Sequence, residues 1–401
     1  MRICLVRCPS PFLIDDMCFP PLGLMAVGTG LKARGHDVTI YDGPIHKVPL
    51  DFDYYGVGPT TPEYASALRL RWRVPKARIV IGGPHATLNT DDCLQDGFDC
   101  VVCGDGELIA GESEIATVCF PAEKPLDEYP IIDRSLLDPY KYKYYLNGRP
   151  ATTLMTSRGC PFKCAFCCKN YDTVRFRSAE SVIKEIDMLW KDYGFHALVF
   201  PEDIFILDRK RTVAICQHLK KREIIWRCLV RGDLITKYGN GFVQMMAESG
   251  CVEVGIGVES GSDEILRNIK KGETVGTIKQ AIRMLKGNGI RVKGFFILAL
   301  PGENRDTLND TEAFLSEMEL EDVDITIYQP YDGTPIWKDK DGYDIQWSDN
   351  IAYGERFFKG RPNEYSGNVS TSALTSEEIV LARDALEREY KSGSVCNHTS
   401  S

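Results

Sequence analysis

The segment Ser157-Arg-Gly-Cys160-Pro-Phe-Lys-Cys164-Ala-Phe-Cys167 directly follows residues 152–156, a short run typical of a buried β-strand. Its three cysteines are separated by three and then two intervening residues. Three thiolates can hold three irons of a four-iron, four-sulfur cluster and leave the fourth iron open to another ligand. The glycine and the proline beside Cys160 favour a loop that wraps around a bulky cluster. The spacing therefore predicts an iron–sulfur site at the end of a strand.

A structural zinc site is the alternative use of these thiols. Such a site is normally closed by four ligands around one ion, and Cys168 is the candidate for the fourth ligand. Adjacent residues such as Cys167 and Cys168 rarely bind one ion together, and no second pair of closely spaced cysteines follows. The spacing favours the iron–sulfur cluster, with zinc as the open alternative.

The residues after this segment repeat a strand–helix pattern. The expected strands are 152–156, 197–200, 225–230, 252–258, 292–298 and 323–328, with helical patterns between them. After the first strand, Ser178 is a candidate helix N-cap and Gly194 a helix stop. Six such units in a row predict a partial (βα)6 barrel, whose functional groups lie at the carboxyl ends of the strands.

The fourth of these strands carries glycine and glutamate on one face. Side chains alternate across a strand, so Glu253, Gly255, Gly257 and Glu259 share a face opposite an apolar one. We expect the apolar face to pack beneath helices. The glycine face is expected to leave room for a ligand inside the barrel, with Glu259 at its carboxyl end.

The first hundred residues also alternate between strands and helices. Strands are expected at 3–6, 38–41, 54–57, 78–81 and 100–102, and helices at 21–34 and 64–72. Glycines follow several of the strands, as in Gly82-Gly83 and in Gly104-Asp-Gly-Glu107. This alternation predicts a Rossmann-like, doubly wound parallel sheet, which binds ligands at the carboxyl ends of its strands.

The sequence thus predicts an α/β protein in four parts. Residues 1–118 form the Rossmann-like domain, and residues 151–330 form the partial barrel. Pro121, Pro125, Pro130 and Pro139 indicate that residues 119–150 are a linker. Residues 331–401 are a carboxyl-terminal helical extension, in which Thr375-Ser-Glu-Glu378 has the pattern of a capping box.

Composition excludes several classes of protein. The chain has 401 residues, of which 43% are hydrophobic and 26% charged, as in globular proteins, and no apolar run reaches the roughly 18 residues of a membrane helix. Arg7 interrupts the apolar start, so we expect no secretory signal and a cytoplasmic protein. The net charge of -9 excludes non-specific coating of nucleic acid. Fifteen irregularly spaced cysteines indicate a cysteine-bound metal in a reducing compartment, not a disulfide scaffold.

The cysteine segment and the barrel pattern around it resemble the radical S-adenosylmethionine (SAM) superfamily. The resemblance implies that Cys160, Cys164 and Cys167 hold a [4Fe–4S] cluster, and that the open iron binds the amino and carboxylate groups of SAM. It also implies that a reduced cluster donates one electron to the sulfonium, which yields a 5′-deoxyadenosyl radical. The cofactors carry this chemistry, and the protein orients and shields them. A reductant protein such as a flavodoxin or a ferredoxin is the implied electron donor.

The same resemblance assigns residues around SAM. Phe166 matches the aromatic residue beside the SAM adenine. Glu202 and Asp203, after the second expected strand, match acidic groups at the SAM ammonium. Arg231, after the third strand, is assigned to the SAM carboxylate, with pairing to a helix end as the alternative. The end of the fourth strand resembles a segment that contacts SAM, which adds Glu259.

The amino-terminal half resembles the cobalamin-binding domain that precedes many radical SAM barrels. The matching positions are Pro21, Gly23, Gly82, Gly83, His85, Gly104 and Glu107. The Asp-x-His-x-x-Gly loop, whose histidine binds cobalt in mutase-type domains, is not found here. His85 is therefore either a ligand or a histidine that is hydrogen-bonded within a turn. The domain either binds cobalamin or is a Rossmann domain without it.

The resemblance implies methyl transfer to an unactivated carbon, with SAM as both methyl donor to cobalt and radical source. The alternative reaction is a cyclisation, a rearrangement or another carbon-centred conversion without methyl transfer. A non-enzymatic iron–sulfur or zinc protein is the third hypothesis. No individual catalytic residue is assigned by the sequence.

Basic residues are concentrated around the cysteine segment. Eight of them lie between residues 141 and 177, with Asp172 as the single acidic residue, and four tyrosines lie at positions 140, 142, 144 and 145. They are Lys141, Lys143, Arg149, Arg158, Lys163, Lys169, Arg175 and Arg177. Such a combination can bind a nucleic acid or a phosphorylated, nucleotide-like substrate. The alternative is that the lysines lie in solvent and the tyrosines pack on the linker.

Overall fold

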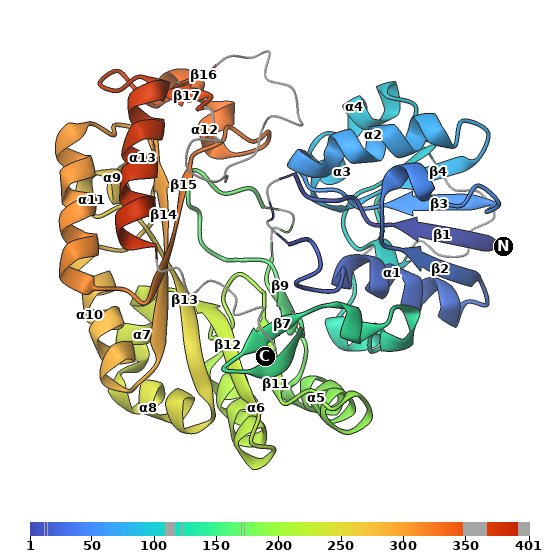
Figure 1. Ribbon diagram of the computed structural model, residues 1–401, viewed down its shortest axis with the longest axis horizontal. Helices are drawn as coiled ribbons and strands as arrows, with labels where there is room; N and C mark the ends of the chain where they lie inside the picture. Colours follow the sequence, from blue (N-terminus) through green and yellow to red (C-terminus); the bar gives the residue numbers. More distant parts are fainter. Residues whose placement is uncertain are drawn as a thin grey trace. The chain divides into compact units, whose positions relative to one another are not determined.

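A computed structural model describes residues 1–391 except residues 12, 14, 109–116, 122, 170, 172 and 348–366. The chain divides into two compact units, Met1–Tyr142 and a second that begins at Lys143. Each unit is built around one largely parallel β-sheet (Figure 1). Asp172 and part of the expected extension lie outside the described residues. No helix within the described ranges has the length and apolar character needed to span a membrane.

The first unit contains a six-stranded sheet in the order β2-β1-β3-β4-β5-β6, with all pairs parallel. Its strands are β1 (Arg2–Val6), β2 (Asp37–Tyr41), β3 (Tyr54–Val57), β4 (Arg78–Ile81), β5 (Cys100–Val102) and β6 (Val118–Cys119). The strand order reverses between β1 and β3, and sheets of this kind bind ligands beside that point. The prediction of a Rossmann-like domain is confirmed, although the short β6 was not expected.

Both faces of this sheet are covered by helices. The helices are α1 (Leu22–Ala33), α2 (Tyr64–Arg73), α3 (Gly83–Leu88) and α4 (Thr90–Gln95). Along β1, Cys4 and Val6 pack in a cluster with residues of α2, whereas Ile3 and Leu5 pack in another with a residue of α1. Figure 1 accordingly shows α1 and α2 on opposite faces. Burial on both sides explains why β5 and residues 3–6 of β1 are short, unbroken apolar runs, whereas the edge strand β2 contains polar residues.

The second unit contains a curled sheet in the order β15-β14-β13-β12-β11-β8-β7. Its strands are β7 (Tyr144–Leu146), β8 (Arg149–Thr153), β11 (Ala197–Phe200), β12 (Ile225–Val230), β13 (Cys251–Glu259), β14 (Arg291–Leu298) and β15 (Asp322–Ile327). All pairs are parallel except that of β7 with β8. The six parallel strands confirm the predicted partial barrel. In addition, β7 and the start of β8 lie in the segment that the sequence suggested as linker.

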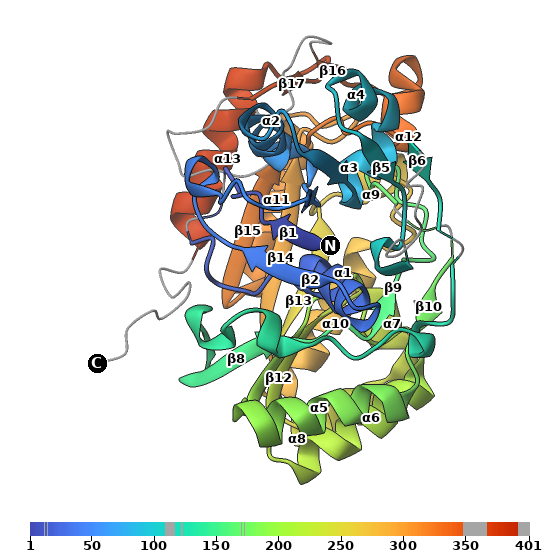
Figure 2. The same cartoon turned by 90° about the vertical axis from the view of Figure 1, so that its right-hand side faces the viewer.

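Helices cover the outer face of the second sheet (Figure 2). They are α5 (Ala179–Tyr193), α6 (Arg209–Lys221), α7 (Gly232–Tyr238), α8 (Asn240–Glu248), α9 (Asp263–Asn268), α10 (Val275–Gly287) and α11 (Arg305–Met318). Ser178 caps α5 by accepting a hydrogen bond from the backbone N–H of Ser181. Gly194 ends the helix in the left-handed conformation, with φ 67°. Both ends of α5 therefore agree with the sequence prediction.

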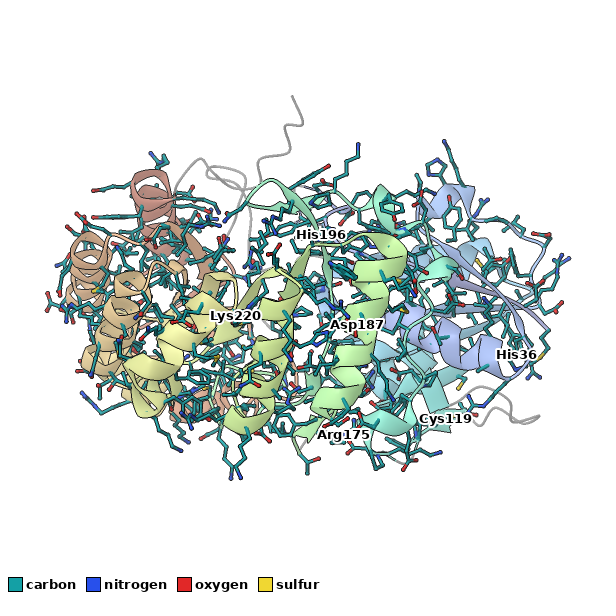
Figure 3. All side chains as sticks on the ribbon, turned by 90° about the horizontal axis from the view of Figure 1, so that it is seen from below. His36, Cys119, Arg175, Asp187, His196 and Lys220 are labelled. Atoms are coloured by element: carbon teal, nitrogen blue, oxygen red, sulfur yellow. The ribbon has the colours of Figure 1, made fainter. Side chains whose placement is uncertain are left out.

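Ion pairs join neighbouring helices of this layer. Asp187 of α5 lies 2.9 Å from Nε2 of His218 and 2.8 Å from Nε of Arg222, which follows α6. Lys220 of α6 pairs with Glu248 of α8 at 3.0 Å. Figure 3 shows Asp187 and Lys220 on adjacent helices. Because these side chains are partly exposed, each pair stabilises little, and the layer depends mainly on the apolar packing beneath it.

The two faces of β13 separate as expected, but the glycine face is filled by the chain itself. On the apolar face, Val254, Ile256 and Val258 are buried and Val252 is half-buried. On the other face, a Cβ added at Gly255 would strike Phe295, and one at Gly257 would strike Glu259 and Lys271. The expectation of room for a ligand at these two glycines is therefore wrong. The glycines make room for side chains from other parts of the barrel.

The described part of the extension packs on the edge of the barrel. It contains α12 (Pro335–Lys338), β16 (Gln346–Trp347), β17 (Val369–Ser370) and α13 (Ser376–Tyr390). The expected capping box begins α13, since Thr375 and Glu378 exchange side-chain and backbone hydrogen bonds. Arg383 of α13 donates to the carbonyl of Ile325 in β15 at 3.0 Å. The helix thereby covers a strand that would otherwise be an exposed sheet edge.

Gly261, two residues beyond β13, is packed against α11 so closely that a side chain does not fit. A Cβ there would lie 2.6 Å from Cα of Thr311 and would also strike the carbonyl of Asp310, both backbone atoms. We predict that Gly261→Ala lowers the free energy of unfolding by about 1–3 kcal/mol. Gly241→Ala, in α8 with open space around the added methyl, should be neutral or slightly stabilising. Urea denaturation compares the two variants, and equal midpoints would contradict the prediction.

Candidate functional site

The three cysteines lie in a loop whose base is closed by a short ladder. Strand β9 (Ser157–Arg158) pairs in antiparallel fashion with β10 (Arg175–Phe176), shortly after β8 ends. Gly159 opens the loop with φ 88°, and a side chain at this position would strike the carbonyl of Thr173. The glycine that the sequence associated with the loop is therefore required by its geometry.

Backbone hydrogen bonds fix the middle of this loop to the barrel. The N–H of Ala165 donates to the carbonyl of Ile269 at 2.8 Å, directly after α9. The carbonyl of Ala165 accepts from the N–H of Ile336 in α12 at 3.2 Å. The neighbouring Cys164 is consequently held in place, although the loop has no regular secondary structure at this point.

The donor set fits a four-iron cluster better than a zinc ion. Cys164 is buried, Cys160 is partly buried and Cys167 is exposed. Phe166, which directly precedes Cys167, is half-buried. In the described parts of the chain, no three His, Cys, Asp or Glu side chains are arranged to hold one metal ion. A closed zinc site needs four ligands at about 2.3 Å from one ion. In a cluster each cysteine binds a different iron, so the sulfurs need not converge on one point.

Cys168, the candidate fourth zinc ligand, points to a different partner. Its thiol donates to the carbonyl of Asp332 at 3.8 Å, outside the cysteine loop. This contact argues against the zinc alternative.

Arg231 directly follows β12 and reaches into the cysteine loop. Its Nη1 lies 3.9 Å from Sγ of Cys164, and its guanidinium carbon lies 3.6 Å from the centre of the Phe162 ring. The latter is a cation–π contact. Burial raises the pKa of the Cys164 thiol, while Lys271 and Arg231 act in the opposite direction.

A buried network of charges surrounds Arg231 at the carboxyl ends of β12 and β13. Arg231 pairs with Asp233 and with Glu273, each at 3.2 Å. Lys271 pairs with Glu259 at 2.7 Å and lies 3.6 Å from Glu273. Only Asp233 has a side chain that is more than 8% exposed. Burial alone would lower the pKa of Lys271, but the two glutamates raise it above its usual value.

Arg231 and Glu259 thus have ion-pair partners within the protein. Arg231 precedes α7 and binds Asp233 in the first turn of that helix, as its alternative interpretation expected. Glu259 ends β13 with φ 66° and binds Lys271. The contacts of both residues with SAM stay predictions.

Glu202 lies in the turn after β11 and is buried, whereas its neighbour Asp203 is exposed. Thr156, just before the cysteine loop, donates a hydrogen bond to Oε1 of Glu202. The other oxygen, Oε2, has no hydrogen-bond partner in the described structure. Burial raises the pKa of this carboxyl to about 7. A buried carboxylate oxygen without a hydrogen-bond donor is unfavourable. The position of Oε2 therefore suits a bound amino group, which can donate to it.

In the first unit, several predicted cobalamin-binding residues lie at the carboxyl ends of β4 and β5. Gly82 and Gly83 follow β4, and Gly104 follows β5. Glu107 is buried in the next turn. Gly104 has φ 91° and open space where a Cβ would lie, so a bulky group can approach its backbone. At Gly82 and Gly83, by contrast, an added Cβ would contact Val102 and Gly58, so the open backbone at Gly104 is the feature that suits a bulky ligand here.

His85 is fully buried instead of being open to a ligand. Its ring centre lies 4.0 Å from that of Tyr64, and its Nδ1 lies 3.2 Å from Oγ1 of Thr61. These contacts match the interpretation as a hydrogen-bonded structural histidine, and a role as cobalt ligand stays a prediction. Pro21 precedes α1, and Gly23 in its first turn has open space at the Cβ position.

Part of the basic segment serves the fold. Arg177 pairs with the buried Glu185 at 2.5 Å. Lys169 donates to the carbonyl of Cys160 at 3.1 Å, which ties the two ends of the cysteine motif together. These two cations therefore stabilise the cysteine loop and its surroundings, a structural use that neither interpretation of the segment specified.

Three residues of the site were missed by the sequence analysis. Phe162 lies between two cysteines, but only the structure places it against Arg231. Lys271 and Glu273 flank Gly272 shortly after a helix, and opposite charges around a glycine were the available signal. That pattern is also typical of exposed turns, so it did not single out these residues.

Comparisons with known proteins now bear on this geometry. Residues 154–315 match the family model for the radical SAM superfamily, and residues 16–112 match that for a B12 binding domain. A protein of Pyrococcus horikoshii, named an uncharacterized methyltransferase, is 31% identical over 387 residues. The similarity covers 84% of this chain and 83% of that relative. The chain belongs to the radical SAM superfamily.

The radical SAM similarity extends over both units. The anaerobic magnesium-protoporphyrin IX monomethyl ester cyclase of Rubrivivax gelatinosus is 24% identical to this chain. The similarity covers 80% of this chain and 66% of the cyclase. The radical SAM methyltransferase TsrM from Kitasatospora setae, solved with cobalamin and a [4Fe-4S] cluster bound, gives a TM-score of 0.69 at 16% identity, with 90% of this chain and 82% of TsrM covered. The predicted family and fold are confirmed. Membership implies a [4Fe–4S] cluster and SAM, and the B12 binding domain implies cobalamin.

Cys164 is a predicted ligand of the cluster, and the thiol of the nearby Cys168 contacts Asp332 outside the loop. We predict that Cys164→Ala loses most of the roughly four irons that a cluster supplies per chain. Cys168→Ala is the matched control and keeps the iron, because the Cys168 thiol contacts Asp332 instead. Iron and sulfide assays after anaerobic reconstitution measure both. Full iron content in Cys164→Ala, or equal loss in both variants, would count against the ligand assignment.

Proposed function

We propose that this protein is a cobalamin-dependent radical SAM methyltransferase acting on an unactivated carbon. The observation that carries the proposal is the presence of two cofactor sites in one chain. A three-cysteine loop ends the first barrel strand, and a B12 binding domain precedes the barrel. When bound, the cluster and SAM supply a hydrogen-abstracting radical, and cobalamin supplies a carrier for the methyl group.

The residues of the loop and of the adjoining strand ends bind and orient these groups. Cys160, Cys164 and Cys167 each hold one iron, within a loop that is fixed through the backbone of Ala165. Glu202 binds the amino group of SAM through Oε2, the buried oxygen that lacks a partner in the described structure. Phe166 lies beside the adenine.

Asp203, exposed next to Glu202, adds negative charge at the amino end of SAM. In the first unit, the open backbone at Gly104 receives the cobalamin ring or its tail. Pro21, Gly23, Gly82 and Gly83 complete that site in this proposal.

The remaining parts of the proposal concern the partners. Radical SAM enzymes need an external reductant, and we assign this role to a flavodoxin or a ferredoxin in a reducing cytoplasm. A phosphorylated or nucleotide-like substrate is a hypothesis that rests on the basic residues between 141 and 177. The substrate itself is left open.

The products of SAM separate methyl transfer from the alternative chemistry. Methyl donation yields S-adenosylhomocysteine, and reductive cleavage yields 5′-deoxyadenosine. We predict both products from the cobalamin-loaded enzyme with a strong reductant, and no 5′-deoxyadenosine from Cys164→Ala. Mass spectrometry quantifies the two. Formation of 5′-deoxyadenosine alone would favour a cyclisation or rearrangement, as the similarity to the cyclase allows, and formation of neither would refute both.

Glu202 gives SAM binding a characteristic pH dependence. Its pKa of about 7 means that the carboxyl is largely neutral at pH 6 and largely ionised at pH 8. At pH 8 the substitution Glu202→Gln removes a negative charge, whereas at pH 6 it replaces a carboxyl that is already mostly neutral. We therefore predict that it weakens SAM binding several-fold more at pH 8 than at pH 6. Asp203→Asn, at the exposed neighbouring residue, should reduce the affinity for SAM by the same factor at pH 6 and at pH 8. Calorimetry on cluster-loaded protein measures the ratios, and a pH-independent effect of Glu202→Gln would be inconsistent with the assigned role.

A further inference from the structure

The side chain of Arg231 makes more contacts than its ion pair with Asp233 in the first turn of α7 requires. A pair with Asp233 alone can form at the protein surface, where Asp233 remains 30% exposed. The Arg231 side chain is instead only 6% exposed, and its guanidinium lies against the Phe162 ring with Nη1 3.9 Å from Sγ of Cys164. Burying a guanidinium is unfavourable unless ion pairs and hydrogen bonds replace the water that it loses. The position of Arg231 therefore calls for a role at the cysteine loop.

The nitrogens of Arg231 divide their partners between the cysteine and the carboxylates. Nη1 faces Sγ of Cys164, and Nε faces Asp233 at 3.2 Å. Nη2 donates to the carbonyl of Lys271 at 2.9 Å and pairs with Glu273 at 3.2 Å. The planar fork of an arginine allows these contacts at the same time, which a lysine ammonium cannot reproduce. The guanidinium thus contacts the sulfur through one nitrogen and binds the carboxylates of Asp233 and Glu273 through the others.

A charge in this position acts on the electron affinity of a bound cluster. A cluster gains one negative charge when it is reduced, so a nearby cation favours the reduced form and a nearby carboxylate opposes it. Hydrogen bonds to the sulfurs and local charge are among the factors that set the potentials of iron–sulfur clusters. Both effects are strong where water is excluded, and Cys164, Arg231 and Glu273 are all buried.

We propose that Arg231 is a positioning residue that raises the reduction potential of the cluster through Cys164, and that Glu273 opposes it. The inference rests on the assignment of Cys164 as a cluster ligand in the proposed function. Arg231 makes the transfer of an electron from the reductant more favourable. The carboxylate of Glu273 and the backbone carbonyl of Lys271 hold Arg231 in place. The negative charge of Glu273 also limits the size of its effect.

Two substitutions of opposite sign test the proposal. Arg231→Met removes the cation, and we expect the midpoint potential of the cluster to fall. Glu273→Gln removes the opposing carboxylate and keeps the shape, and we expect the potential to rise. A tenfold change in the one-electron equilibrium, or about 59 mV, is the expected order of each shift. Arg283→Met, at an exposed arginine paired with Glu317, is the control and leaves the potential unchanged.

Anaerobic redox titration followed by electron paramagnetic resonance measures these potentials on the full chain, alongside iron content. Shifts of opposite sign support the proposal, because general loosening of the loop would move both variants alike. If Arg231→Met assembles no cluster, Glu273→Gln decides: a rise supports the proposal and an unchanged potential overturns it. Unchanged potentials in fully loaded variants overturn this inference alone. Failure of the wild-type chain to assemble a cluster would instead refute the proposed function.

Discussion

Two buried cations, Arg231 and Lys271, lie at the carboxyl ends of β12 and β13, and Arg231 joins these strand ends to the cysteine loop. Because charges withdrawn from water must be paired, they fix the positions of Glu259 and Glu273 as well. The same constraint dictates Gly257, where a side chain would collide with the Glu259–Lys271 pair. Much of the local sequence around the site is therefore set by electrostatics within the protein.

The parallel sheets determine where chemistry can take place in each unit. Strands that run in one direction present all of their carboxyl ends at one edge, where loops are free to vary. In the second unit this edge carries the cysteine loop, Glu202 and the buried charges. In the first unit it carries the glycines after β4 and β5. One topological rule thus explains both candidate sites.

Periodicity and spacing were sufficient to predict the fold. Strand–helix alternation gave both sheets, Ser178 and Gly194 gave the ends of α5, and the cysteine spacing gave the loop. These features depend on residues close together in the chain. The short β6 and β7 were missed because two or three residues carry too little pattern.

The interior of the site was harder to predict, because it depends on residues distant in the sequence. Alternation along β13 correctly placed Gly255 and Gly257 on one face, but it gave no sign that Phe295 and Lys271 would fill that face. The helix-end contact of Arg231 was an open alternative, whereas its contact with Cys164 spans more than sixty residues. A one-dimensional pattern indicates which face a residue occupies and not what packs against it.

The central claim is that three cysteines hold a four-iron cluster whose remaining iron binds SAM. Mössbauer spectroscopy of protein reconstituted with 57Fe, recorded with and without SAM, tests this claim directly. The account predicts a four-iron spectrum in which about one quarter of the absorption, from the iron without a cysteine, changes when SAM is added. A spectrum that SAM leaves unchanged, or a preparation that holds zinc in place of iron, would contradict it.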